Sequence, residues 1–454
     1  MGLLAAHLND AGIVVVNDEK ILYSEPGFAL LEDDHIVTGV EAFRNASLKP
    51  RRIQNRYWSS LSSNSLTDQR FQHMSSADLV SSQLEHIWKK VAAPGDQLAI
   101  AVPAYMSNEN LALLLGIAAE LGIEIVAMSD AAVSATRRQY QHAVPVHIDL
   151  GLHCSMLTRL MQEGQSQVER TEIIDDCGLV RLHETWLKVV AEVFVQQSRF
   201  DPLHTAETEQ ALKVSMPEWL AQASSSSLVP LQLEFRGVSH QAEIDSLQLV
   251  AAAAPVYQSI VSSLRALYRA EETPAIQLSD RAARMPGLAD TLKTRVGGEV
   301  FLLEPGATAR GLIKRCKPGD AKGGVTLTRH MPWDQSPVAV EAADAGGNGG
   351  QPTHLLFGHK AFQLSGKPLV LGTQAAEGER CLDLQQEMPG VSRRHCVLSA
   401  ENGQYVISDQ SRYGTFLNGH RIDASAVLQI GDLIRIGTPG FELRMISVED
   451  ADGS

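Results

Sequence analysis

The chain has 454 residues and a formal net charge of -14 at pH 7, and 44% of its residues are hydrophobic. This length is enough for two or three domains that each bury a core. The acidic balance argues against a nucleic-acid-binding protein, because contacts to phosphates need clustered Lys and Arg. The apolar runs are too short to span a bilayer, so we expect no membrane insertion.

Five cysteines are scattered along the chain, and no two of them form a CxxC pair. An odd number without paired spacing favours reduced thiols over a disulfide framework or a metal site. The N-terminus carries Asn9 and Asp10 where a signal peptide needs an apolar run. We therefore expect a cytoplasmic protein and predict no metal-binding residue.

Strands and helices alternate in the first two-thirds of the chain. The apolar strand Leu98–Val102 is followed by an amphipathic helix that ends before Gly122, and then by a second apolar strand at 123–127. Asp130 can cap the next helix. A further strand and two amphipathic helices are predicted at 147–151, 181–197 and 251–269. This alternation predicts a parallel α/β sheet.

Regular patterns fade between residues 317 and 352. Pro and Gly are frequent there, and residues 346–350 read Gly-Gly-Asn-Gly-Gly. This composition is typical of a flexible linker.

The hydrophobic period changes to two after residue 352, which predicts a β-sandwich. Short strands are expected at 404–408 and 441–446. The apolar stretches 427–430 and 433–436 flank Gly431-Asp432, a pair that favours a β-hairpin.

The motif Ser392-x-x-His395, followed by Tyr413-Gly414-Thr415 and then Asn418-Gly419, resembles a forkhead-associated (FHA) domain. The resemblance covers residues 353–449. It implies an all-β sandwich that binds a protein partner phosphorylated on threonine.

The FHA resemblance implies a phosphopeptide site on the sandwich loops. Phosphothreonine brings three acceptor oxygens and about two negative charges, so it needs short polar donors and a cation. Its binding residues are expected to be Ser392, Arg393, Ser411, Thr415 and Asn418. By the same resemblance, His395 braces its loop. The alternative is that these are ordinary turn residues of a sandwich that serves only as a protein-interaction surface.

Two positions depart from the FHA pattern. The usual Gly-Arg of the first binding loop is Gly372-Thr373 here, and Tyr413 replaces an Asn that would contact the peptide backbone. Arg380, Arg394 or Arg412 are candidates to replace the missing arginine.

Four short motifs occur in an informative order in the N-terminal region: Ala101-Val102-Pro103, Ile148-Asp149-Leu150-Gly151, Arg284-Met285-Pro286-Gly287 and Glu304-Pro305-Gly306-Ala307. Together they resemble the ATPase domain of the seventy-kilodalton heat-shock chaperones. The resemblance covers residues 1–316 and implies a two-lobed α/β fold of the actin-like type. Another doubly wound α/β domain is the alternative.

The nucleotide-binding positions of that ATPase family are degenerate here. The first phosphate loop falls near residues 7–11 without its glycines, and Asp280-Arg281 replaces a Gly-Gly pair on the adenosine side. Asp149 and Gly151 keep part of a cofactor site, and Asp130 can stand for a catalytic Glu. Asp149 can equally be a turn residue at the end of a strand.

Two functional hypotheses follow. In the first, a pseudo-ATPase domain of the chaperone type is a scaffold, and the FHA domain makes the protein a phosphopeptide-dependent adaptor with no cofactor. In the second, ATP and Mg²⁺ bind at Asp149 and Gly151, and slow hydrolysis, with Asp149 and Asp130 as catalytic residues, drives a switch regulated through the FHA domain. Since glycines are needed where backbone N–H groups approach phosphates, their loss favours the first hypothesis and argues against an enzyme.

Overall fold

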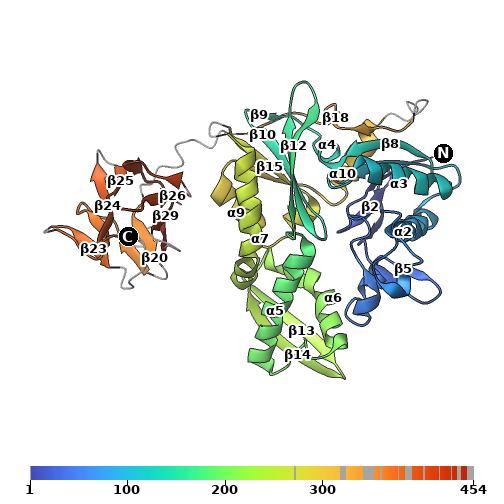
Figure 1. Cartoon of the computed structure of the whole chain (residues 1–454), viewed down its shortest axis with the longest axis horizontal. Helices are drawn as coiled ribbons and strands as arrows, with labels where there is room; N and C mark the ends of the chain where they lie inside the picture. The colour runs from blue at the N-terminus through green and yellow to red at the C-terminus, as the bar shows by residue number, and fades with distance from the viewer. Residues whose placement is uncertain are drawn as a thin grey trace. The chain divides into compact units, whose positions relative to one another are not determined.

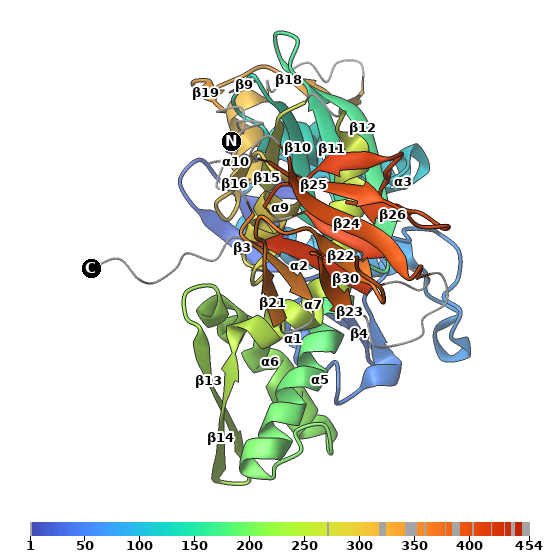
Figure 2. The ribbon, with the colours of Figure 1, turned by 90° about the vertical axis from the view of Figure 1, so that its left-hand side faces the viewer.

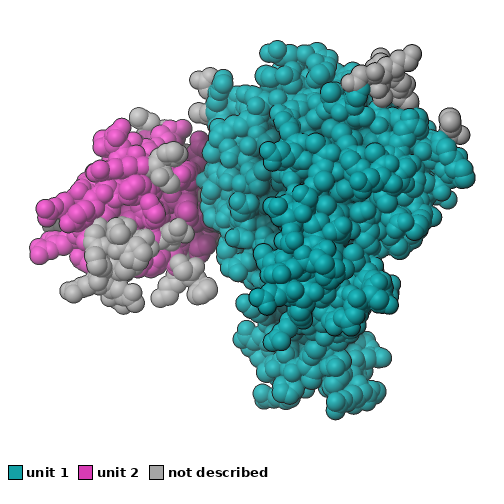
Figure 3. Space-filling view, turned by 45° about the vertical axis from the view of Figure 1, so that its right-hand side comes forward, with its two compact units in different colours: residues 1–342 teal, residues 343–454 magenta. Residues whose placement is uncertain are grey.

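The structure is a computed structural model that describes residues 2–269, 272–316, 324–340, 352–357, 360–376, 378–383, 391–401, 404–418, 420–430, 432–436 and 441–446. The chain divides into two compact units, residues 1–342 (unit 1) and 343–454 (unit 2), which are coloured separately in Figure 3. Unit 1 mixes helices and strands, whereas the described elements of unit 2 are strands. A mixed α/β region followed by a β-rich region agrees with the order predicted from the sequence.

The first half of unit 1 is built on a sheet with the strand order β8-β7-β1-β2-β3. β1, β2 and β3 pair antiparallel, whereas β7 and β8 continue parallel to β1. Leu98 and Ile100 of β7 pack toward α2 and α3, and the alternating Ala99 and Ala101 pack toward α10 on the other face. The bounds are β1 (Leu3–His7), β2 (Ile13–Val16), β3 (Ile21–Glu25), β7 (Gln97–Val102), β8 (Ile125–Asp130), α2 (Ser76–Val91), α3 (Asn108–Glu120) and α10 (Ala307–Arg315).

The second half of unit 1 repeats this topology with the strand order β16-β15-β10-β11-β12. Its first three strands again pair antiparallel, and its last two run parallel to the first (Figure 1). Trp186 of α5 and Tyr257 of α7 belong to the core that covers Ile148 of β10. The bounds are β10 (Val144–Leu150), β11 (Cys154–Met161), β12 (Ser166–Asp175), β15 (Pro274–Leu278), β16 (Glu299–Leu302), α5 (Leu179–Ser198), α7 (Ser246–Leu267), α8 (Asp280–Ala283) and α9 (Leu288–Val296).

The elements predicted for unit 1 from periodicity are confirmed with small shifts of their ends. The predicted strand Leu98–Val102 corresponds to β7, and the helix that follows is α3, whose end lies before Gly122. The second apolar strand begins two residues later than predicted, at Ile125. Asp130 caps a short helix, as expected, because its carboxylate accepts a hydrogen bond from the N–H of Ala132 at 2.8 Å.

Each half of unit 1 also carries a smaller insertion. Their elements are β4 (Ala29–Leu31), β5 (Ile36–Thr38), α1 (Val40–Phe43), η1 (Pro50–Arg52), β6 (Ile53–Gln54) and η2 (Gln69–Phe71) in the first half, and α6 (Ala206–Ala223), β13 (Leu228–Phe235) and β14 (Val238–Asp245) in the second. α7 is long and apolar enough to cross a membrane by length and composition alone. Its buried residues, among them Tyr257 and Ile260, pack in the core of unit 1, as in the core helix of a globular domain.

Residues 324–340, which the sequence places inside a flexible linker, instead pair with unit 1 as three two-residue strands. We call this segment the strap. β17 (Leu327–Thr328) pairs with β8 of the first sheet, and β18 (His330–Met331) pairs with β12 of the second. β19 (Val338–Ala339) pairs with β9 (Tyr140–Gln141). The strap therefore ties both halves of unit 1 together. The rest of the predicted linker, 317–323 and 341–352 with its glycine run, lies outside the described residues except for Pro352.

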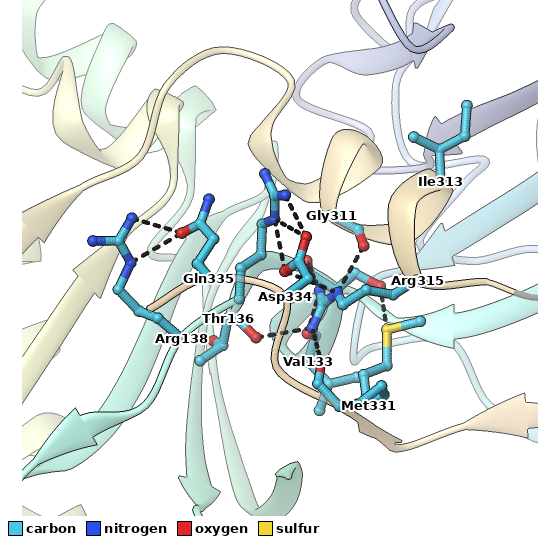
Figure 4. A network of polar contacts seen from close by, with 12 residues as sticks. Val133, Thr136, Arg138, Gly311, Ile313, Arg315, Met331, Asp334 and Gln335 are labelled. Carbon is cyan, nitrogen blue, oxygen red and sulfur yellow. Dashed lines mark hydrogen bonds and ion pairs between the residues drawn. The ribbon is translucent and has the colours of Figure 1, made fainter. Parts of the chain in front are cut away.

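A buried arginine at the end of α10 holds the strap in place (Figure 4). The Arg315 side chain is 2% exposed and donates hydrogen bonds to the carbonyl oxygens of Val133, Thr136 and Pro332 at 2.9, 3.0 and 3.3 Å. Burial lowers the pKa of its guanidinium to about 10. Further polar contacts to the strap join Arg137 to Asp334 and Arg138 to Gln335. One guanidinium thus links α10, α4 (Ala131–Ala135) and the strap.

Unit 2 is a sandwich of two sheets around a core that includes Leu371, Ile407 and Ile434 (Figure 2). One sheet has the order β21-β20-β30-β29-β26-β27 and the other β23-β22-β24-β25-β28. The bounds are β20 (His354–Phe357), β21 (Lys360–Gln363), β22 (Leu369–Gly372), β23 (Arg380–Asp383), β24 (Arg394–Glu401), β25 (Gln404–Asp409), β26 (Thr415–Leu417), β27 (His420–Arg421), β28 (Ser425–Val427), β29 (Leu433–Ile436) and β30 (Phe441–Ile446).

The hairpin predicted around Gly431 is wrong. β28 pairs with β25 in one sheet, whereas β29 pairs with β26 and β30 in the other. The turn therefore carries the chain from one sheet to the other. Gly419 and Gly431, both predicted in turns, lie outside the described residues.

Candidate functional site

Two equivalent turns meet at the centre of unit 1, one after β1 (residues 9–12) and one after β10 (residues 149–154); we call them the central turns. The Asn9 amide donates to Asp149 Oδ2 at 2.7 Å and to the carbonyl of Leu150 at 3.1 Å. Asp10 Oδ1 accepts from the N–H of Leu152 at 2.8 Å. Side chains of the first turn therefore bind the second turn directly.

Arg281, at the start of α8, completes this network. Its guanidinium is 2.9 Å from Asp149 Oδ1 and also donates to the carbonyl of Gly12 at 2.7 Å. The Arg281 and Asp149 side chains are only 6% and 4% exposed. His7 Nε2 lies 3.4 Å from the other carboxylate oxygen of Asp149. A buried cation thus neutralises Asp149 from within the chain.

The electrostatics of the central turns follow from these contacts. Burial alone would raise the pKa of Asp149, but Arg281 and His7 outweigh it and hold the pKa of this carboxyl well below its usual range. Burial raises the pKa of Asp10 to about 6. Burial lowers the pKa of His147 to about 4, so its imidazole is neutral at pH 7.

The residues predicted for a nucleotide site do not form a phosphate cradle. The N–H groups of Ala11 and Leu152 are bound by the side chains of Asn9 and Asp10, and the N–H of Gly151 donates to the carbonyl of Cys154 at 2.8 Å. Donors that would receive a triphosphate are therefore already used, and Arg281 binds the carboxylate that Mg²⁺ would need. The central turns do not fit ATP with Mg²⁺.

Asp130, the other predicted catalytic carboxylate, is buried and caps α4. It shares no hydrogen bond or ion pair with Asp149 among the described residues. Within the described part of the chain, no group of three His, Cys, Asp or Glu side chains is arranged to hold a metal ion.

A cavity of about 760 Å³ lies beside the central turns. Its lining includes Gly12, Phe28, Lys213, Arg281 and Arg284. Lys213 and Arg284 form ion pairs with Glu209 and Asp280, so the cations of this lining are largely paired inside unit 1.

Three loops of unit 2 meet at a second site: 373–376 after β22, 391–393 before β24, and 410–414 before β26. We call them the loop cluster. The carbonyl of Arg393 accepts hydrogen bonds from the N–H groups of Thr373 and Gln374 at 2.7 and 2.9 Å. Gly372, at φ 150°, has no room for a Cβ because that carbonyl lies against it. The close approach of the first two loops explains the glycine.

His395 joins the second loop to the third. Its Nδ1 accepts from the N–H of Ser392 at 3.1 Å, and its Nε2 lies 3.3 Å from the carbonyl of Gly414 and donates to it. The residue is fully buried, and burial lowers the pKa of the imidazole. These contacts confirm the bracing role that the sequence predicts for His395.

Ser392 and Ser411, two of the predicted binding residues, lie in the loop cluster with partly exposed side chains. Ser392 Oγ accepts from the N–H of Arg412 at 3.2 Å, and Ser411 Oγ accepts from the N–H of Gly414 at 2.7 Å. Since each hydroxyl accepts in these bonds, each O–H remains able to donate to an incoming anion.

Thr415 and Asn418 are placed differently from the predicted serines. Thr415 is fully buried, and its hydroxyl donates to Asp409 Oδ1 at 2.8 Å. Asn418 follows β26 at its other end, where its amide donates to Asp432 at 2.7 Å and its oxygen accepts from the N–H of Leu433 at 3.0 Å. Both side chains stabilise loops, and only Ser392, Arg393 and Ser411 of the predicted set lie together and partly open to solvent.

The candidate replacements for the missing arginine differ in their availability. Arg394 binds both carboxylate oxygens of Glu379 and also Gln410. Arg380 lies on β23 with its Nε and one Nη buried and, in the described chain, without a hydrogen-bond partner. Arg393 and Arg412 are exposed and have no ion-pair partner among the described residues. Arg412 therefore remains as the available replacement from that predicted group.

Asn9 and Asp409 are structural residues that sequence reasoning missed. Each is a short polar residue at the end of a strand, which is common in loops and carries no signal of its own. Asp409 accepts bonds from the N–H of Ser411 at 3.0 Å and from the Thr415 hydroxyl, so it fixes the third loop.

Residues 378–437 match the FHA domain family. FHA domains are interaction modules that recognise phosphothreonine in protein partners. The match contains the second and third loops of the loop cluster and does not extend to unit 1. No curated protein matches the chain.

Proposed function

We propose that the protein is a phosphopeptide-dependent adaptor in the cytoplasm, in which unit 2 recognises a threonine-phosphorylated protein and unit 1 is a pseudo-ATPase scaffold. The observation that carries the proposal is the loop cluster. It presents the Ser392 and Ser411 hydroxyls and the exposed Arg393 guanidinium on loops fixed by His395 and Asp409. A preformed set of donors with a cation suits a phosphate dianion.

The repeated topology of unit 1 supports an actin-like, chaperone-type ATPase fold. Two sheets have the same order of three antiparallel and two parallel strands, and the central turns lie at the end of β1 in one and of β10 in the other. The pseudo-ATPase part of the proposal rests on the buried ion pair between Arg281 and Asp149. Arg281 occupies space that a metal–triphosphate complex would need and neutralises the carboxylate that would bind the metal.

The test of recognition is binding of a phosphothreonine peptide library to the full chain. We expect an enriched motif and a loss of about ten- to a hundredfold in affinity in Ser392→Ala, because a hydrogen bond to a charged group contributes about 1.5–3 kcal/mol. Ser399→Ala is the matched control, since Ser399 lies on the same strand as His395 and its hydroxyl binds Glu401. Equal binding of unphosphorylated peptides would refute the recognition proposal.

The scaffold proposal is tested by titrating the full chain with Mg-ATP in a calorimeter and by thermal unfolding with millimolar nucleotide. We expect neither heat of binding nor a shift of the melting temperature of unit 1. A saturable heat together with a shift would show that unit 1 binds nucleotide and would refute the pseudo-ATPase part of the proposal.

A further inference from the structure

We infer that the outer face of β26 and its two neighbouring strands binds an acidic segment of the partner, which continues from the phosphothreonine held by the loop cluster. We call this surface the arginine strip; it consists of Phe416, Arg421 and Arg435 on these strands and of Arg412 and Tyr413 on the adjoining third loop of the loop cluster. The inference rests on the proposed phosphopeptide recognition and extends it to the chemistry of the neighbouring peptide.

Strand register places the three strand residues of the strip on one face of the sheet. Phe416 of β26 lies opposite Arg421 of β27 on one side and opposite Arg435 of β29 on the other. Directly opposed residues in a sheet point to the same face. Thr415, next to Phe416, is buried on the inner side, so Phe416 and its two arginine neighbours face outward.

The strip is continuous with the loop cluster. The Arg421 side chain lies against Gly414, where its guanidinium leaves no room for a Cβ. Gly414 is the residue whose N–H binds Ser411 and whose carbonyl binds His395. Arg421 of β27 thus reaches the third loop of the loop cluster, which carries Ser411, a predicted phosphate-binding residue.

The aromatic rings hold two of the guanidinium groups in place. The Arg435 guanidinium carbon lies 4.8 Å from the Phe416 ring centroid, and the Arg412 carbon lies 5.7 Å from the Tyr413 ring centroid. Tyr413 is 60% exposed, so its ring and the Arg412 guanidinium are both open to solvent. Arginines stacked on rings lose less side-chain entropy when they bind a carboxylate.

The strip carries three arginine side chains without ion-pair partners among the described residues. Arg412, Arg421 and Arg435 are all exposed, and none forms an ion pair with another described residue. Arg435 of β29 pairs in register with Glu442 of β30. In a chain with a net charge of -14, three adjacent unpaired arginines favour an anionic partner. Tyr413 also replaces the Asn that would contact the peptide backbone, so we expect contacts to acidic side chains to make up the lost affinity.

The experiment compares three peptides by fluorescence anisotropy with the full chain: a phosphothreonine peptide flanked by Asp and Glu, the same peptide with neutral flanks, and the acidic peptide without phosphate. We expect acidic flanks to improve affinity by about three- to tenfold, a gain typical of a few exposed ion pairs. The gain should disappear in Arg421→Gln/Arg435→Gln and persist in Lys367→Gln, which removes an exposed charge elsewhere in unit 2.

The outcomes separate this inference from the proposed function. Phosphate-dependent binding without a gain from acidic flanks overturns the inference and leaves the recognition proposal standing. Binding that ignores the phosphate refutes recognition itself. A single-stranded oligonucleotide that displaces the acidic phosphopeptide from the wild type, and binds less well to the double variant, would assign the strip to nucleic acid instead.

Discussion

Arginine is used in opposite ways in the two units. In unit 1, Arg281 and Arg315 are buried and bind groups of the chain itself, a carboxylate in one case and backbone carbonyls in the other. In unit 2, Arg393, Arg412 and Arg421 are exposed and have no ion-pair partner in the described chain. The same side chain is bound within the fold in unit 1 and exposed to solvent in unit 2.

This difference in arginine burial indicates which unit can bind an anionic ligand. A buried guanidinium whose hydrogen bonds are satisfied inside the fold resists displacement, because its removal leaves an uncompensated charge. An exposed guanidinium on fixed loops is already solvated and can exchange water for an anion. The proposal of recognition by unit 2 and of a scaffold role for unit 1 follows this difference.

The largest expected effect comes from breaking the buried pair of unit 1. Arg281→Met leaves Asp149 charged and buried, so we expect the free energy of unfolding to fall by about 3–5 kcal/mol. Urea unfolding monitored by tryptophan fluorescence measures this loss of stability in unit 1 alone, because all five tryptophans lie within residues 1–342.

Two variants control the Arg281 experiment. Arg284→Met removes a neighbouring arginine whose side chain is 63% exposed and should change stability little. Arg281→Met/Asp149→Asn removes both charges and should recover part of the loss. An Arg281→Met protein as stable as Arg284→Met would contradict a structural role for the pair.

A smaller loss is expected where Arg315 holds the strap. Arg315→Met leaves several buried carbonyls without a donor, which should lower the free energy of unfolding by about 2–4 kcal/mol. Hydrogen exchange of residues 324–340 should also rise selectively, since these residues pair with strands of both halves. Arg310→Met, at an ion pair on the more exposed side of α10, is the control. Unchanged exchange in the strap would show that its strands hold without Arg315.

The smallest effect concerns pH and the loops of unit 2. The folded-state pKa of His395 is depressed from about 6.5, so its neutral form stabilises the fold fully above that pH. This contribution is lost as pH falls from 6.5 toward the folded pKa. Exchange of the amides in β24 and β26, corrected for intrinsic rates, should therefore rise at pH 5, and His395→Asn should remove this dependence. Peptide affinity is a poor readout here because the phosphate itself titrates near pH 6.

Much of unit 1 could be predicted because its elements are long enough to show their period. β7, α3 and β10 follow from runs of apolar residues with clear ends. The sequence also indicated that bulky residues replace glycines at the nucleotide positions. It could not show that Arg281 pairs with Asp149, because the two are 132 residues apart and only the fold joins them.

The two fold predictions that were wrong, a linker over the strap and a hairpin at Gly431, have a common cause in short strands. Each strand of the strap has two residues, too few to show alternation, and nearby prolines and glycines suggest a linker. Around Gly431, the sequence shows two apolar stretches separated by a turn. This pattern is the same for two strands that pair as a hairpin and for two strands that belong to different sheets. Thr415 and Asn418 fit a family motif, and their side chains bind Asp409 and Asp432, so their role in phosphopeptide binding stays a prediction.

The strap has a practical consequence for work with fragments. A polypeptide that stops at residue 316 lacks β17 and β18, so β8 and β12 would present bare hydrogen-bonding edges to solvent. Bare edges recruit strands from other molecules and promote aggregation. Unit 1 should be expressed through at least residue 340, and a shortened version should precipitate at concentrations where the longer one stays in solution.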